Sequence, residues 1–252
     1  MKNFEYSEVV TRFYDVVYKS MRNSTDHSYY LKEILESDGP VLEVGVGTGR
    51  LFCHALEKGA DIFGIDVSKL MLKKLKDKTK QEDHFRVQHQ DARTLSLGKK
   101  FNLIIAPFRM FSHILLIEDQ LKVLNNIYNH LENNGKFIFD VFVPAPSRIS
   151  KSTEPTVDFE GEYEPGKMIK RITSVEPDYI NQISLVTMKF EWEEEGNAKE
   201  DSFKFPFRYY FRYELENLIA RSSLRLDKMY GDFKNNDLTE DSKDFVIVCS
   251  KG

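Results

Sequence analysis

The 252-residue sequence has few cysteines and no long apolar segment, and each absence excludes a class of protein. Its two cysteines, Cys53 and Cys249, are too few for a disulfide framework and lack the spacing of metal ligands, so we expect buried, reduced thiols and no metal site. No apolar run approaches the roughly 20 residues that span a bilayer, so no membrane-spanning helix is expected. The opening residues, MKNFEYSEVV, lack the basic and apolar regions of a signal peptide, and together these absences predict a cytoplasmic protein.

Positive charge is not in excess either. The 36 basic residues are outnumbered by 40 acidic ones, which gives a net charge of −4 and no reason to expect nucleic-acid binding as the main task. Hydrophobic residues make up 41% of the chain, enough to fill a core. A chain of this length is expected to form one large domain or one domain with an insertion.

The most informative stretch is Val41–Arg50, VLEVGVGTGR. An apolar strand, Val41–Val44, carries an acid at Glu43 and runs into a glycine-rich loop that precedes an amphipathic segment. Three glycines stand at alternate positions of this loop: Gly45, Gly47 and Gly49. Glycine lets a ligand lie against the main chain, and a helix that begins there directs unpaired N–H groups at the ligand. The stretch therefore predicts a strand–loop–helix that seats a small molecule with an anionic group.

Strand-like and helical segments then alternate, as in an α/β fold with a doubly wound parallel sheet. The second strand, Asp61–Asp66, ends in an acid about 20 residues after the glycines, a position that suits a ribose diol. The alternative interpretation of Asp66 is a solvated aspartate at a strand end. Further strands are expected at residues 84–90, 101–106, 136–143, 224–230 and 244–250.

The loop E-V-G-V-G-T-G resembles the glycine-rich loop of the class I S-adenosylmethionine-dependent methyltransferases. A dinucleotide fingerprint would instead need glycine where Arg50 stands. The closing segment R-Y-E-L-E-N-L-I-A-R-S and the final DFVIV are also similar to this family, and the resemblance covers about residues 10–143 and 208–252. It implies a Rossmann-like seven-stranded sheet with the last strand antiparallel, with S-adenosyl-L-methionine as cofactor and S-adenosyl-L-homocysteine as product.

The resemblance also implies which residues contact the cofactor. Asp91 would accept a hydrogen bond from the exocyclic amine of adenine, and the backbone N–H of Ala92 would serve a ring nitrogen. Tyr14 lies in a Y-D-x-x-Y segment of the kind that folds over the cofactor, although a packing role is equally open. Met71 would lie against the adenine or be a core methionine. The full set is Tyr14, Glu43, Gly45, Gly47, Gly49, Asp66, Val67, Met71, Asp91, Ala92 and Ala106.

The aromatic loop Pro107–His113 is expected to border both cofactor and acceptor, because ligands of such sheets lie beyond the carboxyl ends of the strands. His113 and Tyr14 are the candidate catalytic residues, for use as a base or to favour a neutral amine. For His113 a buried or capping role is the alternative. Arg109 would suit a carboxylate or phosphate on the acceptor, or pair with a neighbouring acid. The substrate-binding candidates are Tyr18, Phe108, Arg109, His113, Arg208 and Tyr210.

Helical periodicity vanishes between about residues 147 and 211, and alternation of apolar and polar residues takes over. This pattern predicts an antiparallel meander of three or four strands with one apolar face. We therefore expect a core at residues 1–143 and 212–252, with an N-terminal helical cap, and an inserted antiparallel β lid at residues 144–211. The apolar face can instead pack on its own hairpins or on another subunit.

The sequence thus predicts a methyltransferase that acts on a small-molecule acceptor at nitrogen or oxygen, as a monomer or homodimer. The alternative from another class is a non-catalytic S-adenosylmethionine-binding scaffold or regulator. A nicotinamide-dependent oxidoreductase conflicts with Arg50.

Overall fold

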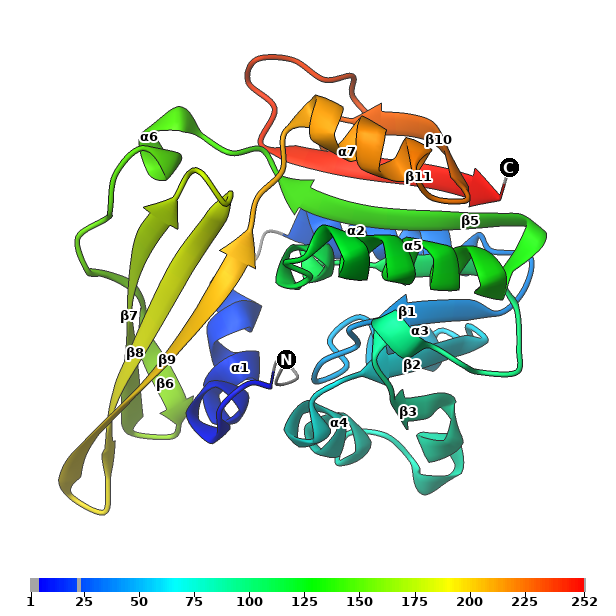
Figure 1. Ribbon diagram of the computed structural model, residues 1–252. Coiled ribbons are helices and arrows are strands. Elements are labelled where there is room, and N and C mark those ends of the chain that lie inside the picture. Colours follow the sequence, from blue (N-terminus) through cyan, green and yellow to red (C-terminus); the bar gives the residue numbers. More distant parts are fainter. Residues whose placement is uncertain (1–4, 22–23, 252) are drawn as a thin grey trace. The chain divides into compact units, whose positions relative to one another are not determined.

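The computed structural model describes residues 5–21 and 24–251, and this part of the chain divides into two units (Figure 1). The first unit comprises residues 24–143 and 210–251 and is built on a seven-stranded sheet. The second comprises residues 5–21 and 144–209 and is built on a four-stranded sheet.

The sheet of the first unit has the order β10-β11-β5-β4-β1-β2-β3. Its strands are β1 (Val41–Val44), β2 (Ile62–Asp66), β3 (Val87–His89), β4 (Phe101–Ala106), β5 (Leu131–Phe142), β10 (Leu224–Tyr230) and β11 (Asp244–Lys251). The strands from β1 to β5 pair in parallel, and β11 lies antiparallel between β5 and β10. This arrangement confirms the predicted doubly wound sheet with an antiparallel last strand.

Helices cover both faces of this sheet. The helices are α2 (Ser24–Leu35), α3 (Phe52–Glu57), α4 (Lys69–Lys76), α5 (Ile117–His130) and α7 (Arg212–Ala220), with 3-10 helices η1 (Gln81–Arg86), η2 (Ala92–Thr94) and η3 (Met110–His113). Successive side chains of a strand point to opposite faces, so Ile104 packs with residues of α5 and α7 while Ile105 packs with those of α2, α3 and α4. The uninterrupted apolar run of β4 is therefore buried on both sides, as such a run predicts.

The third strand is shorter than expected. The predicted strand began at residue 84, whereas β3 begins at Val87 and is preceded by η1. The ring of His84 lies at hydrogen-bond distance from the carbonyl oxygens of Lys76 (3.0 Å) and Thr79 (3.3 Å), at the end of α4. His84 therefore interacts with the end of a helix, and the strand starts only after it.

The second unit contains α1 (Glu8–Met21), α6 (Pro146–Ile149), β6 (Thr156–Glu164), β7 (Lys167–Asp178), β8 (Ile183–Glu194) and β9 (Asn197–Arg208). Its strands pair antiparallel in the order β6-β7-β8-β9, so the predicted meander is present with four strands. Pro206 lies in β9, an edge strand, where the missing N–H of proline is tolerated.

Helix α1 packs against the apolar face of the inserted sheet. The ring of Phe13, 1% exposed, meets Tyr163, Phe190 and Trp192 at centroid distances of 5.0, 6.0 and 5.3 Å. The sequence predicts an N-terminal helix that caps the core of residues 1–143 and 212–252. The structure instead groups α1 with the inserted sheet, because Phe13 is buried among aromatic rings of that sheet.

Ion pairs reinforce this packing within the second unit. Arg12 of α1 donates to Glu194 of β8 at 2.6 Å. Arg171 of β7, only 4% exposed, makes two hydrogen bonds with Asp158 at 2.9 and 2.8 Å, and its guanidinium lies 5.3 Å from the ring centroid of Tyr18. The ring of Tyr18 therefore contacts the buried guanidinium of Arg171.

Candidate functional site

The glycine loop joins β1 to α3, and its three glycines have positive φ angles. A Cβ atom on Gly45 would lie 2.4 Å from Cγ of Met110, and one on Gly49 would lie 2.7 Å from Cγ of Leu75. At Gly47 the nearest atom would be the carbonyl oxygen of Gly45, 4.0 Å away. Gly45 and Gly49 are therefore required by the packing of the protein itself, whereas Gly47 borders open space.

Asp66 connects the end of β2 to this loop. Its Oδ2 accepts a hydrogen bond from the N–H of Gly47 and its Oδ1 from the N–H of Ser68, each at 2.8 Å. Burial raises the pKa of Asp66, and the hydrogen bonds from Ser68 and Gly47 oppose that rise. Each carboxylate oxygen keeps a lone pair, so the group can still accept hydroxyl donors. Val67, the next residue, accepts a hydrogen bond at its carbonyl from the ring of His89 at 2.9 Å.

Glu43 is 1% exposed, and its Oε2 has no hydrogen-bond partner among the residues that the structure describes. Burial raises the pKa of Glu43 well above its ordinary value, and the nearby charge of Arg50 opposes this. A buried carboxyl oxygen without a partner is costly, so a donor or cation from outside the protein would stabilise it. Glu43 therefore has the chemistry of a ligand contact.

Three further predicted cofactor residues are buried. Met71 and Ala106 are 0% exposed and Ala92 is 8% exposed. Met71 lies in the first turn of α4, where its N–H donates to the side chain of Ser68 at 3.3 Å. The burial of Met71 agrees with the interpretation as a core methionine. Asp91 directly precedes η2, and its carboxylate accepts hydrogen bonds from Arg93.

The loop after β4 has an unusual backbone. Phe108 and Arg109 have φ angles of 59° and 63°, a left-handed conformation that residues other than glycine seldom adopt. The carboxylate of Asp140 accepts hydrogen bonds from the Arg109 N–H at 3.1 Å and from the Tyr30 hydroxyl at 2.6 Å. Asp140 is not among the site residues predicted from the sequence. Its signal was a lone acid within the apolar run KFIFDVFV.

The predicted acceptor contacts on this loop have other partners in the structure. The Arg50 guanidinium lies 3.7 Å from the ring centroid of Phe108. Arg109 pairs with Asp244 at 2.9 Å, which agrees with the alternative of an ion pair. His113 is partly buried, and burial lowers its pKa to about 4, so the imidazole is neutral near neutral pH.

Tyr210 lies in the core of the first unit, which differs from its predicted role as a substrate contact. It is 0% exposed. Its hydroxyl donates toward the carbonyl oxygens of Phe111 (3.3 Å) and Ile114 (3.2 Å) and accepts from the Gln120 amide at 3.1 Å. Tyr210 therefore stabilises η3, on which His113 lies, from inside the protein.

The remaining candidates lie in the second unit. Tyr14 and Tyr18, one helical turn apart on α1, have ring centroids 4.4 Å apart. The Arg208 guanidinium donates to the carbonyl of Asn181 at 3.3 Å and to the side chain of Gln182 at 3.5 Å, so it is directed at the turn between β7 and β8. Their predicted roles at the cofactor and the acceptor stay predictions.

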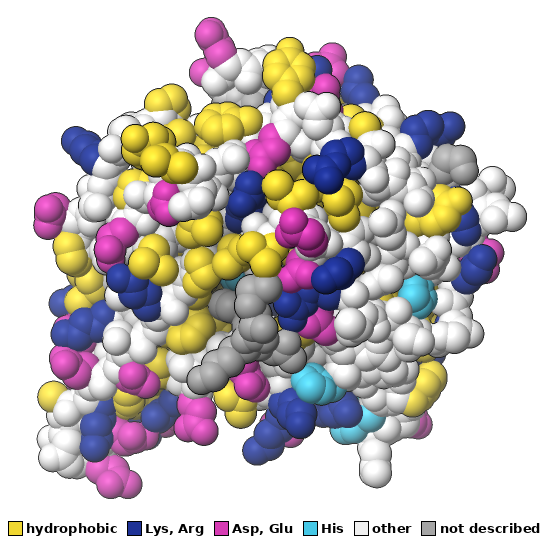
Figure 2. All heavy atoms as spheres, in the orientation of Figure 1, with side chains coloured by type: hydrophobic (Ala, Val, Ile, Leu, Met, Phe, Trp, Pro, Cys, Tyr) yellow, Lys and Arg dark blue, Asp and Glu magenta, His cyan; other side chains and the backbone are white. Residues whose placement is uncertain are grey.

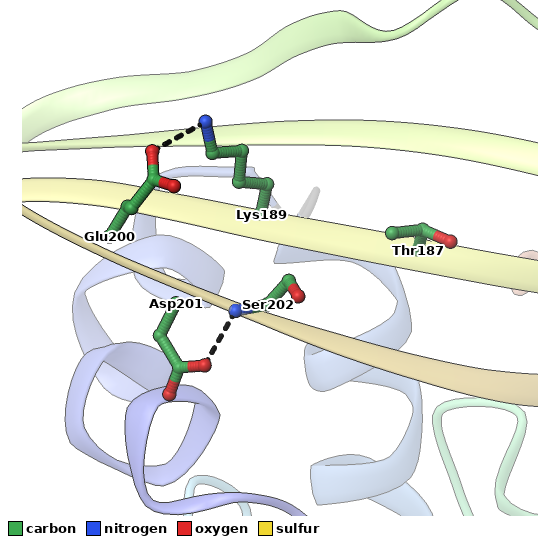
Figure 3. A pocket seen from close by; sticks show the side chains of 5 residues that line it. All are labelled: Thr187, Lys189, Glu200, Asp201 and Ser202. Carbon is green, nitrogen blue, oxygen red and sulfur yellow. Dashed lines mark hydrogen bonds and ion pairs between the residues drawn. The ribbon is translucent and has the colours of Figure 1, made fainter.

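The second unit also has an open pocket on its sheet (Figure 3). Of the described residues, it is lined by Thr187, Lys189, Glu200, Asp201 and Ser202. The Lys189 ammonium pairs with Glu200 at 2.8 Å, and the Asp201 carboxylate accepts the Ser202 N–H at 2.7 Å. Each charged group of this pocket thus has a partner within the lining, and none of the predicted site residues lines it.

The described residues contain no group of three or more His, Cys, Asp or Glu side chains that could hold a metal ion. In the same part of the chain, no helix has the length and apolar character to cross a membrane. Both cysteines are free thiols, and burial raises the pKa of Cys249. Basic and acidic side chains are interspersed on the face that Figure 2 shows.

Comparison with known proteins gives the same class of fold. A family model described as a methyltransferase domain matches residues 41–135. The glycine/sarcosine N-methyltransferase of Aphanothece halophytica is 24% identical over 256 residues, which covers 98% of this chain and 89% of that protein.

Two solved structures resemble the whole chain. An S-adenosylmethionine-dependent methyltransferase from Clostridium acetobutylicum has a TM-score of 0.78 at 16% identity, covering 97% of this chain and 98% of the other. CalS10, an amino pentose methyltransferase from Micromonospora echinaspora with S-adenosylmethionine bound, has a TM-score of 0.72 at 16% identity and full coverage of both chains, 100% each. With the strand order, these structural neighbours show that the chain has the fold of the class I S-adenosylmethionine-dependent methyltransferases, and residues 41–135 match a methyltransferase domain.

Proposed function

We propose that this protein transfers the methyl group of S-adenosylmethionine to an amine nitrogen of a small molecule. The observation that carries the choice of nitrogen is the partial burial of His113 in η3, just after the loop that follows β4, which lowers its pKa to about 4. The comparisons support the class of acceptor, because one relative is named for glycine and sarcosine and one structural neighbour for an amino pentose. Glycine, sarcosine and amino sugars are all small amines.

Three groups of the first unit fit the cofactor. S-Adenosylmethionine carries an ammonium group, which the partnerless Oε2 of buried Glu43 can accept. Its ribose offers two hydroxyl donors, which the remaining lone pairs of the Asp66 carboxylate can accept. The open space at Gly47 leaves room for a ligand against the main chain. When bound, the cofactor supplies an electrophilic methyl group on a sulfonium cation.

Nitrogen and oxygen acceptors differ in the base that they need. An alcohol holds its proton so tightly that a strong base is required, whereas an amine can lose its proton to water before it reacts. An imidazole with a pKa of about 4 is a poor base at neutral pH, yet its neutral ring can accept a hydrogen bond from an amine N–H. We therefore assign His113 the task of orienting a neutral amine.

We also propose that residues 144–211 act as a lid, as the sequence predicts. Because α1 packs on the inserted sheet through Phe13 and Arg12, any movement of the sheet would carry α1 with it. Tyr14 and Tyr18 would then move as parts of the lid, which extends the predicted lid to include α1.

The test is a methyl-transfer assay with S-adenosylmethionine labelled in its methyl group and matched pairs of acceptors. Glycine is paired with glycolate and glucosamine with glucose. In each pair, one compound carries an amine where the other carries a hydroxyl group. We expect label in the amines and a rate that rises with pH as the amine loses its proton. Label only in the hydroxyl compounds would contradict the proposal. Cofactor binding without transfer to any amine would favour the scaffold alternative.

A further inference from the structure

The turn at Asp91–Arg93 contains a carboxylate that is largely filled by one neighbour. Oδ1 of Asp91 accepts the backbone N–H of Arg93 at 2.9 Å. The Arg93 Nε–H lies between the two carboxylate oxygens, at 3.0 and 2.9 Å, and Nη2 donates to Oδ2. A carboxylate offers about four lone-pair sites. Because the Nε–H is shared, the three N–H groups of Arg93 place two contacts on each oxygen, and a further donor can approach only at the part of the Asp91 side chain that stays exposed, 19%.

Helix α5 holds this turn in place from the other side. The Arg93 Nη1 donates to Asp119 at 3.3 Å, and Asp119, 8% exposed, also pairs with Lys122 at 2.9 Å. The side-chain amide of Asn126 donates to the carbonyl of Ala92 at 3.0 Å. Two side chains of one helix thus stabilise both the guanidinium of Arg93 and the backbone between it and Asp91.

The same contacts determine the charge of Asp91. Burial alone would raise its pKa, but the hydrogen bonds from Arg93 outweigh burial and lower it. An ionised carboxylate has acceptor sites only and no proton to donate. A carboxylate that Arg93 holds in one orientation can accept an N–H donor only at its exposed side, and it repels a carbonyl oxygen there.

We propose that Arg93 is a positioning residue that makes Asp91 selective for the 6-amino group of the cofactor's adenine. The inference rests on the proposed contact between Asp91 and the adenine amine. The new element is that selectivity for the amino group depends on Arg93, which itself contacts no ligand. It also depends on Asp119 of α5, which pairs with Arg93 and holds its guanidinium in place.

The experiment measures binding only and needs no acceptor. Calorimetry compares S-adenosylhomocysteine with S-inosylhomocysteine, in which a 6-oxo group replaces the amine. The wild-type protein should prefer the amino compound by about tenfold or more, since an unpaired polar group is rejected strongly. Arg93→Ala should reduce this preference at least about threefold, and Arg93→Lys, which keeps the charge without the planar fork, should reduce it less.

A double-mutant cycle with Asp91→Asn separates positioning from general stabilisation. If Arg93 acts through Asp91, the double variant should lose no more preference than Asp91→Asn alone. The control is Arg86→Ala, which removes an arginine paired with Asp61 and Asp83 and should leave the preference unchanged.

Two outcomes would overturn the inference while leaving the cofactor assignment intact. One is a wild-type protein that binds both compounds equally. The other is a folded Arg93→Ala or Arg93→Lys variant that binds both more weakly in an unchanged ratio. Failure of the wild-type protein to bind S-adenosylhomocysteine would instead contradict the proposed function itself.

Discussion

The buried carboxylate of Asp140 accepts a hydrogen bond at 3.1 Å from the backbone N–H of Arg109, which lies 31 residues earlier in the chain. Asp140 lies near the carboxyl end of β5, and Arg109 has the left-handed φ of 63°. The Tyr30 hydroxyl, at 2.6 Å, holds the other carboxylate oxygen. One acid thus connects α2, β5 and the loop in front of η3, and stabilises a backbone conformation that is unfavourable by itself.

We expect Asp140→Ala to destabilise the protein by about 2–4 kcal/mol, because it takes the acceptor from the buried Tyr30 hydroxyl and from the partly buried N–H of Arg109. Asp140→Asn keeps an acceptor oxygen and should lose less than half as much. Urea denaturation gives both values. Equal losses in the two variants would show that the hydrogen bonds of Asp140 are not the cause.

Glu43 should link stability to pH. Its raised pKa means that the ligand-free folded protein holds the proton more tightly than the unfolded chain does. Stability should therefore fall as pH rises from the unfolded value, about 4.3, through the raised value. Glu43→Gln should remove this dependence and be more stable than wild type at neutral pH by about 1–3 kcal/mol.

Denaturation of both proteins between about pH 5 and pH 8 measures this effect. The same substitution should weaken S-adenosylmethionine binding, because the amide carries no charge to meet the ammonium. A Glu43→Gln protein that is less stable than wild type at neutral pH would contradict the account of Glu43.

Gly47→Val should abolish cofactor binding while the protein stays folded. Open space surrounds its Cβ position, so the new side chain would stand where the ligand meets the backbone. The matched control is Gly59→Val, because Gly59 also has a positive φ, 86°, and no atom within 4 Å of its Cβ position. Both variants should lose similar stability, but only Gly47→Val should lose binding in calorimetry. Normal binding by Gly47→Val would place the ligand elsewhere.

Phe13→Ala should destabilise the second unit by about 3–5 kcal/mol, because the ring is buried against three aromatic side chains of the inserted sheet. Arg12→Ala should cost at most about 1 kcal/mol, since its pair with Glu194 is over a third exposed. Hydrogen exchange should show the loss caused by Phe13→Ala as faster exchange in β6 and β8, the strands that carry these three rings. Unchanged protection there would show that the sheet does not depend on α1.

The sequence predicts local features of this fold well. The loop after β1 and the acid at the end of β2 were predictable because glycine spacing and strand ends are encoded within a few residues. The run FNLIIA likewise indicates a strand buried on both faces. Prediction from local sequence is less accurate at β3, because His84 interacts with the end of α4 and the strand begins only after it.

Contacts between distant segments were not predictable in this way. Tyr30 bonds to Asp140 across 110 positions, and Arg12 pairs with Glu194 across 182. The burial of Tyr210 depends on contacts with η3 and α5, nearly a hundred residues away. Its aromatic and polar character alone suits a binding site and a core equally, so only the fold distinguishes the two.

The cofactor site is tested most directly by a calorimetric titration of the purified protein with S-adenosylhomocysteine and, separately, with NAD. S-Adenosylhomocysteine should bind and NAD should bind far more weakly. In Asp66→Ala, affinity for S-adenosylhomocysteine should fall by about 1–3 kcal/mol through lost ribose hydrogen bonds. Binding of NAD without binding of S-adenosylhomocysteine, or an unchanged affinity in Asp66→Ala, would contradict the site described.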